Sequence, residues 1–263
     1  MKIYDAHLHI GNISDTEVVS PRDVRKFLTR MGVEGGLAMP VALRGGGDNM
    51  ELHQQLYKEA IEEGFEVALY VNKEMLATSP DLSAFWNFPF KAIKIHPDAV
   101  RFTDDELEIV RRAAIDKFVP LMIHTGSDNW CRASRFETII KSCHESAETV
   151  ILCHARPAEE AFMLVDRYVN VWLDTAHLSL EKLRSRLTPK NEKRILFGSD
   201  FPTNRWFPHL GNETDWYKRQ IETISQLSQK VIGENFELLM EDVRRCVRIK
   251  EIIKKHRQMN ALP

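Results

Sequence analysis

The sequence predicts an α/β fold, a distorted (β/α)8 TIM barrel with a helical extension at its C-terminus. Eight short apolar runs alternate with amphipathic segments, and 263 residues suit one such barrel. No glycine-rich phosphate turn follows the first run, which argues against a dinucleotide-binding Rossmann sheet. We expect a single domain, with the barrel over about residues 1–232 and C-terminal helices over about residues 233–263.

The eight expected strands recur along the first 200 residues. They are Lys2–Ile10, Gly36–Leu43, Phe65–Asn72, Phe90–Pro97, Val119–Gly126, Thr149–Ala155, Val169–Ala176 and Arg194–Asp200. Strands that alternate with helices indicate β-α-β units, and such units build a parallel sheet.

The segments between these strands carry helix-start signals. Ser20-Pro21-Arg22-Asp23 combines an N-cap serine, a proline in the first turn and an acid at the third helical position. Thr103 precedes Asp104-Asp105-Glu106, whose charges favour the positive end of a helix dipole. Other helices are expected near Asn49–Glu63, Ala133–Glu145, Pro157–Tyr168, Leu178–Leu187, Trp216–Ile232 and Asn235–His256. The link Lys73–Trp86 is the least regular one.

Composition excludes several classes of protein. Lys and Arg number 36 and Asp and Glu 38, and a net charge of −2 does not suit a nucleic-acid-binding protein. The N-terminus is too polar for a signal peptide, and no apolar run reaches the roughly 18 residues of a membrane span. The four cysteines show no Cys-x-x-Cys spacing, which fits a reducing cytoplasm. We therefore expect a cytoplasmic protein that acts on a small molecule and binds neither nucleic acid nor membrane.

Half of the ten histidines fall at or near the C-terminal ends of expected strands, where barrels of this kind build their active sites. They are His7, His9, His96, His124 and His154, and Asp200 ends the eighth strand. Imidazole nitrogen and carboxylate oxygen are ligands that zinc prefers. These residues therefore predict a metal site that activates water.

Strand parity orients these side chains. Residues two apart share a face of a strand, so His7 and His9 point the same way, and Lys94 and His96 do too. We expect these side chains and Asp200 to point into the barrel. His177 lies beyond the seventh strand with the wrong parity for Asp174, and we expect it in a solvated loop.

Six motifs follow one another in order from about residue 3 to 202. They are Asp5-Ala6-His7-Leu8-His9, Lys94-Ile95-His96-Pro97, Ile123-His124-Thr125-Gly126, Cys153-His154-Ala155, Leu173-Asp174-Thr175 and Leu196-Phe197-Gly198-Ser199-Asp200-Phe201-Pro202. Together they resemble the amidohydrolase superfamily, and within it the amidohydrolase-related (amidohydrolase 2) group, which includes metal-dependent decarboxylases.

The resemblance implies a role for each of the main residues. His7, His9 and His124 would bind a buried metal, and Asp200 would be both a ligand and the acceptor of the proton of the attacking water. His154 would be a second-metal ligand in a binuclear site, or the residue that activates water or polarises the substrate. The implied cofactor is one or two divalent ions, with zinc expected and manganese as the alternative.

Other residues near the motifs have more than one interpretation. Lys94 raises the alternative of a carboxylated lysine that bridges two metals, and His96 either contacts substrate or caps its strand. Arg156 stands where relatives often have a Gly-Gly turn, and Arg156 and Arg44 are candidates for binding a substrate carboxylate. Asp5 is either a partner that orients a histidine or a buried structural acid.

The sequence therefore predicts a metal-dependent hydrolase that cleaves an amide, lactone or ester bond. The alternative is a non-oxidative metal-dependent decarboxylase of a small unsaturated or aromatic acid. A phosphoesterase that begins with the same Asp-x-His-x-His pattern expects a histidine soon after the final Ser-Asp, where this chain has Phe201-Pro202. A non-catalytic barrel that binds a metal or a partner is the remaining alternative. Relatives often dimerise, so the resemblance implies a homodimer, which no sequence feature decides.

Overall fold

The computed structural model describes residues 2–14, 16–41, 50–85 and 87–246. At its centre is a nine-stranded sheet with the strand order β2-β1-β3-β4-β5-β6-β7-β8-β9. The strands are β1 Tyr4–Ser14, β2 Glu17–Val19, β3 Gly35–Pro40, β4 Glu66–Val71, β5 Ala92–Ile95, β6 Leu121–His124, β7 Val150–Cys153, β8 Val171–Asp174 and β9 Ile195–Leu196. All neighbours pair in parallel except the hairpin of β1 and β2, so the eight predicted parallel strands are present.

The sheet closes into a barrel because residues 197–201, which follow β9, return to β1. The Phe201 carbonyl accepts a hydrogen bond from the His9 amide at 2.7 Å, and the Asp200 amide donates to the His7 carbonyl at 2.9 Å. The predicted (β/α)8 barrel is therefore confirmed. The short strand β2 is an addition that the sequence did not predict.

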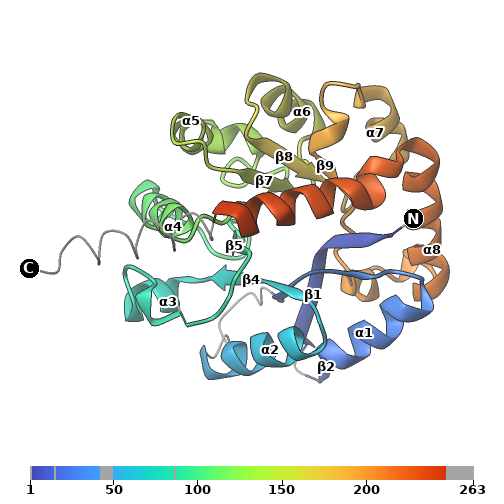
Figure 1. Cartoon of the computed structure of the whole chain (residues 1–263), viewed down its shortest axis with the longest axis horizontal. Helices are drawn as coiled ribbons and strands as arrows, with labels where there is room; N and C mark the ends of the chain where they lie inside the picture. The colour runs from blue at the N-terminus through green and yellow to red at the C-terminus, as the bar shows by residue number, and fades with distance from the viewer. Residues whose placement is uncertain (1, 15, 42–49, 86, 247–263) are drawn as a thin grey trace, which may run out of the picture.

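Helices surround the strands (Figure 1). They are α1 Pro21–Arg30, α2 Met50–Glu62, α3 Lys73–Thr78, α4 Asp104–Lys117, α5 Glu137–Glu145, α6 Ala158–Arg167, α7 Leu180–Arg186 and α8 Glu213–Leu227. Both predicted helix starts are capped as expected. The Ser20 side chain accepts from the Asp23 amide, and Thr103 and Glu106 form a reciprocal capping box. The irregular link between β4 and β5 contains α3, which was not predicted.

Short helical turns fill the remaining connections. They are the 3-10 helices η1 Ser83–Phe85, η2 Ala133–Phe136, η3 Glu192–Arg194, η4 Thr203–Trp206 and η5 Pro208–Leu210, and the π-helix η6 Lys230–Glu234. Residues 235–246 continue from η6 as the red helix of Figure 1. A Cβ on Gly233 would lie 2.1 Å from the Lys2 carbonyl oxygen, so glycine lets η6 pack on the start of β1. The predicted C-terminal extension is thus present to residue 246, and its remainder lies outside the described residues.

Apolar side chains fill the space between strands and helices. Phe27 of α1 stacks on Phe201 with ring centroids 4.3 Å apart, and Tyr217 of α8 lies edge-on to Phe27 at 5.2 Å. Inside the barrel, polar side chains meet: His7 of β1 contacts Lys94 of β5, a strand that β1 does not pair with. Among the described helices, none combines the length and the apolar character needed to cross a membrane.

Gly198 lies where β1, β8 and the chain after β9 converge. A Cβ at this position would be 3.0 Å from the Cβ atoms of both His7 and Asp174. We predict that Gly198→Ala lowers the free energy of unfolding by about 1–3 kcal/mol, because overpacking displaces both side chains. Urea denaturation measures the change. Gly35→Ala is the matched control, since its Cβ would meet nothing closer than 3.9 Å, and equal losses in the two variants would contradict the prediction.

Candidate metal centre

A cleft of about 400 Å³ opens at the C-terminal end of the barrel strands. Its lining consists of His9, Val41, His96, Asp98, Ala99, His124, His154, Arg156, His177, Asp200, Thr203, Trp206 and Phe207. Six of the residues predicted for the site are in this lining, and the predicted residues His7 and Lys94 are buried next to it. This is the end at which (β/α)8 barrels carry their active sites.

His7, His9 and Asp200 converge on one point. The Nε2 atom of His9 lies 2.9 Å from Asp200 Oδ1, and the Nε2 atom of His7 lies 3.2 Å from the same oxygen. The two Nε2 atoms are 3.2 Å apart. Ligand atoms at about 2.0–2.2 Å from a zinc ion are separated from one another by roughly 3–3.5 Å. The triangle therefore has the size of one face of a coordination sphere.

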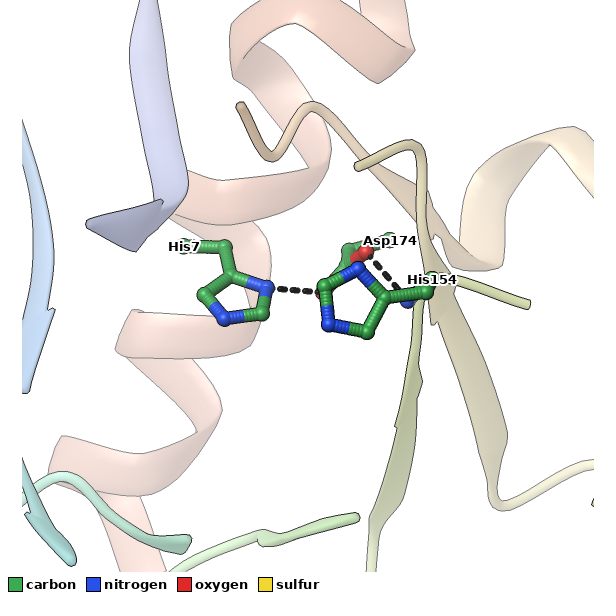
Figure 2. A group of neighbouring side chains, drawn as sticks. All are labelled: His7, His154 and Asp174. Atoms are coloured by element: carbon green, nitrogen blue, oxygen red, sulfur yellow. Dashed lines mark hydrogen bonds and ion pairs between the residues drawn. The ribbon is translucent and has the colours of Figure 1, made fainter. Parts of the chain in front are cut away.

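Hydrogen bonds on the far side of each ring decide where its proton lies. His7 Nδ1 is 2.8 Å from Asp174 Oδ2 (Figure 2), and His9 Nδ1 is 3.1 Å from the Pro40 carbonyl oxygen. Carboxylate and carbonyl oxygens only accept, so both Nδ1 atoms donate, and in its neutral form each ring turns an unprotonated Nε2 toward Asp200. Three electron pairs then face one another, an arrangement that a bound cation stabilises. The donor set fits a divalent metal ion.

Burial sets the protonation states that metal ligands need. It lowers the pKa of His7, and it lowers the pKa values of His124 and His154 well below the usual range. Burial alone would raise the pKa of Asp200. Its neighbours His7 and His154, together with a hydrogen bond from His177, instead hold the pKa of this carboxyl well below its usual range. Burial therefore disfavours the charged forms of these imidazoles, and the Asp200 carboxyl beside them is ionised.

His154 has a buried nitrogen without a partner. The residue is 2% exposed, and within the described part of the chain nothing hydrogen-bonds to its Nδ1. Its backbone amide donates to Asp174 Oδ1 at 2.8 Å (Figure 2). Its φ of +67° lies in the left-handed region. A buried polar atom without a hydrogen bond costs roughly 1–3 kcal/mol. A bound ion or ligand at this ring would remove that cost.

His124 stacks on His96 and does not join the triangle of His7, His9 and Asp200. The two ring centroids are 3.6 Å apart and the planes differ by 20°. His96 Nδ1 accepts from the Ala99 amide at 3.0 Å, so the neutral ring carries its proton on Nε2.

Burial lowers the pKa of His96 to about 3, which keeps this ring neutral. His96 therefore caps a turn through Nδ1, and its contact with a substrate stays a prediction. The ligand role of His124 stays a prediction.

The predicted cationic residues differ in their placement. Lys94 is 1% exposed and its Nζ lies 3.4 Å from His7 Nε2, within reach of the candidate metal, and its carboxylation stays a prediction. Arg156 lines the cleft, as expected for a residue that binds a substrate carboxylate. Arg44 lies outside the described residues. Arg205 of η4, which is not one of the predicted site residues, lies outside the lining and pairs with two glutamates, at 2.5 and 3.0 Å.

The expectation that His177 lies in a solvated loop is wrong. Its Nε2 is 2.8 Å from Asp200 Oδ2, its side chain is 18% exposed, and it lines the cleft. The prediction assumed that strand alternation continues to His177, but β8 ends at Asp174. His177 lies beyond the strand with a φ of +56°. No local motif marks His177, and only the fold brings it to Asp200.

Asp174 and Asp5 have separate roles that the sequence left open. Asp174 orients the His7 ring, as described above. Asp5 accepts hydrogen bonds from the Ser199 hydroxyl at 2.5 Å, the Tyr217 hydroxyl at 2.7 Å and the His7 amide at 3.0 Å. Burial raises the pKa of Asp5 to about 6. Asp5 is thus the buried structural acid that ties β1 to the chain after β9 and to α8.

No protein-family model matches the chain, and no curated protein matches it by sequence. Solved structures do match. A candidate 2-pyrone-4,6-dicarboxylic acid hydrolase from Pseudomonas putida is 14% identical, with a TM-score of 0.63 over 92% of this chain and 98% of that one. Amidohydrolase 2 from Bifidobacterium longum subsp. infantis is 16% identical, with a TM-score of 0.62 over 92% and 99%.

A third similar structure is 4-oxalomesaconate hydratase from Rhodopseudomonas palustris. It is 14% identical, with a TM-score of 0.57 over 96% of this chain and 99% of that one. At such identities the likeness establishes the fold. It agrees with the barrel that the sequence predicted, over nearly the whole length of each chain.

The bond between Asp174 and His7 yields a prediction for metal affinity. Asp174→Asn replaces an acceptor by an amide that cannot fix the same His7 tautomer, so we expect the affinity for zinc to fall about 10- to 100-fold. Competition with a chromophoric chelator measures the dissociation constant. Asp116→Asn on the exposed face of α4 is the control. Unchanged affinity in Asp174→Asn would show that this bond does not orient a metal ligand.

Proposed function

We propose that the chain is a metal-dependent hydrolase of the amidohydrolase type. It cleaves an amide, lactone or ester bond of a small substrate that carries a carboxylate. The observation that carries this proposal is the convergence of His7 Nε2, His9 Nε2 and Asp200 Oδ1 beside an open cleft. The similarity of fold to amidohydrolase 2 and to the candidate dicarboxylic acid hydrolase supports it.

His7, His9 and Asp200 would hold the ion, and the unused nitrogen of His154 makes that ring a further ligand. Nitrogen and oxygen donors in this ratio favour zinc, with manganese as the alternative. When bound, such an ion polarises a carbonyl group and lowers the pKa of water.

Asp200 is the residue that takes the proton from the attacking water. Its carboxylate is ionised, and its Oδ2 lies 2.8 Å from both His177 Nε2 and Thr203 Oγ1, which belong to two other residues of the cleft lining. These two contacts orient the acceptor oxygen. The neutral ring of His96 offers its Nε2–H group to a substrate oxygen, as a hydrogen-bond donor that does not change charge.

The cleft also defines the class of substrate. A volume of about 400 Å³ admits a small molecule. Arg156 can bind a carboxylate in its lining, and Trp206 and Phe207, 45% and 40% exposed, offer flat apolar surface beside it. Two of the similar structures carry names of carboxylic acid substrates, which supports the same class here.

The cysteines support the proposed cytoplasmic location. Cys131, Cys143 and Cys153 are buried, Cys246 is partly buried, and all four are free. Free thiols persist in a reducing compartment.

Labelled water tests the reaction. We expect the zinc-loaded protein to open lactones or cleave amides in ¹⁸O water and to place ¹⁸O in the carboxylate product, because water is the nucleophile. Mass spectrometry measures the label. Stripping the metal abolishes the reaction, and zinc restores it. Release of carbon dioxide without ¹⁸O in the organic product identifies the decarboxylase alternative.

Arg156 tests the substrate class. We predict that Arg156→Met raises KM for carboxylate-bearing substrates about 10- to 100-fold, because a charge-assisted hydrogen bond contributes about 1.5–3 kcal/mol. Steady-state kinetics on each substrate and its neutral methyl ester measure the difference. Arg205→Met is the matched control, since Arg205 lies outside the cleft lining. An equal loss for acid and ester would exclude carboxylate binding by Arg156.

A further inference from the structure

The Oδ2 atom of Asp200, the proposed acceptor of the proton, is held by a donor that belongs to no motif. It lies 2.8 Å from His177 Nε2. A carboxylate oxygen only accepts, so the His177 ring donates through its Nε2–H group. Asp200 itself has a φ of +62°, a left-handed backbone position that surrounding contacts must hold. The direction of Oδ2 therefore depends on the orientation of the His177 ring.

The backbone around His177 does not by itself fix that ring. β8 ends at Asp174 and α7 begins at Leu180, so His177 lies in the connection between them. Its side chain is 18% exposed. The last torsion of a histidine side chain is broad and roughly two-fold, and a half-turn puts a ring carbon where Nε2 was. Packing against the ring must therefore decide whether the N–H group faces Asp200.

Phe207 supplies packing of this kind. Its ring centroid lies 5.7 Å from that of His177, and the two planes differ by 74°, an edge-to-face contact. His209 contacts the Phe207 ring in the same manner, at 5.9 Å and 69°. The Phe207 amide donates to the Asn204 carbonyl and its own carbonyl accepts from the Leu210 amide, both at 2.9 Å. Phe207 is thus fixed by its backbone and braced by a second ring, and edge-to-face pairs favour a defined orientation of both rings.

We propose that Phe207 is a positioning residue that acts on Asp200 through His177. Its ring holds the imidazole in the orientation in which the Nε2–H group fixes Oδ2 of Asp200. The proposal rests on the proposed function and deepens it, because it gives one aromatic residue of the cleft a task other than contact with the substrate.

The adjacent residue Trp206 provides a contrast within the same cleft. Trp206 and Phe207 both line it and are 45% and 40% exposed. Among the described residues, the His177 ring has ring contacts with Phe207 and His154 and none with Trp206. His154 is itself a proposed ligand, so a change there would disturb the ion site directly. Phe207 is therefore the ring neighbour of His177 at which positioning can be tested separately.

The ring proton of His177 reports this orientation without any reaction. The whole chain is labelled with ¹⁵N-histidine and loaded with zinc, and the ring N–H signals are recorded by NMR. The signal that disappears in His177→Asn belongs to His177, and asparagine suits this position because it tolerates positive φ. We expect this proton to exchange with water about 3- to 10-fold faster in Phe207→Leu, since the edge-to-face contact is lost. Phe207→Tyr keeps the ring and the wild-type rate.

A second phenylalanine gives the matched control. Phe118 is 44% exposed and lies between the end of α4 and the start of β6, at the opposite end of the barrel from the cleft. Phe118→Leu makes the same chemical change and leaves the exchange rate of the His177 proton at the wild-type value. Circular dichroism checks that each variant is folded.

Kinetics separate positioning from substrate contact. The probe is 4-acetoxybenzoate, a small ester with a carboxylate. We expect Phe207→Leu to lower kcat about 3- to 10-fold and to change KM less than about two-fold, because the proton acceptor is misdirected while binding persists. Phe207→Tyr restores kcat. Trp206→Leu raises KM, because it removes surface that contacts the substrate.

The two measurements fail independently of each other. An unchanged exchange rate in Phe207→Leu, or an equal change in Phe118→Leu, overturns the proposal and leaves the proposed function intact. A rise in KM with unchanged kcat makes Phe207 a plain contact surface and also overturns it. If the wild type hydrolyses neither this ester nor the lactones and amides of the labelled-water assay, the proposed function is overturned. The exchange rate then still decides whether Phe207 holds the His177 ring.

Discussion

The return of residues 197–201 to β1 is the constraint on which the site depends. The backbone bonds between His9 and Phe201 and between His7 and Asp200 close the barrel. They also bring His7 of the first motif within 3.2 Å of Asp200 of the last motif, although 193 positions of sequence (200 − 7) separate them. Closing a loop of this length carries a large entropic cost. The packing of Gly198 and the buried hydrogen bonds of Asp5 oppose that cost.

The same closure creates an electrostatic arrangement that needs a cation. Asp174 and the Pro40 carbonyl each take the Nδ1 proton of one histidine, which leaves two bare nitrogens facing a carboxylate oxygen. The lowered pKa of His7 and the His154 nitrogen, which has no hydrogen-bond partner among the described residues, also favour a bound ligand. The stability of the barrel holds His7, His9 and Asp200 in an arrangement that costs free energy when no ligand is bound.

Much of the fold could be predicted from local patterns. Apolar runs located all eight parallel strands, and the capping residues Ser20 and Thr103 marked two helix starts. The pattern missed β2 and α3, which span three and six residues. Elements this short contain too few residues to show a periodic pattern. Whether they form depends on their pairing or packing with neighbouring elements.

For the site residues that lie on strands, the sequence also predicted the direction of the side chain. Strand parity correctly predicted that the side chains of His7, His9 and Lys94 point into the barrel, because strand geometry fixes the direction of alternate side chains. It failed for His177, whose direction depends on a left-handed backbone position after the strand. Strand parity also did not predict that the His124 ring stacks on the His96 ring.

The sequence by itself determined the barrel, the end of the barrel at which the candidate site lies and the residue types that could bind a metal there. Those properties follow from periodicity and from the chemistry of each side chain. The tertiary structure decided which nitrogen of each histidine is free, which acid orients His7 and which histidine meets the second oxygen of Asp200. Those properties depend on distances between residues far apart in the chain, and a distance across a closed barrel is set by the packing of all its strands.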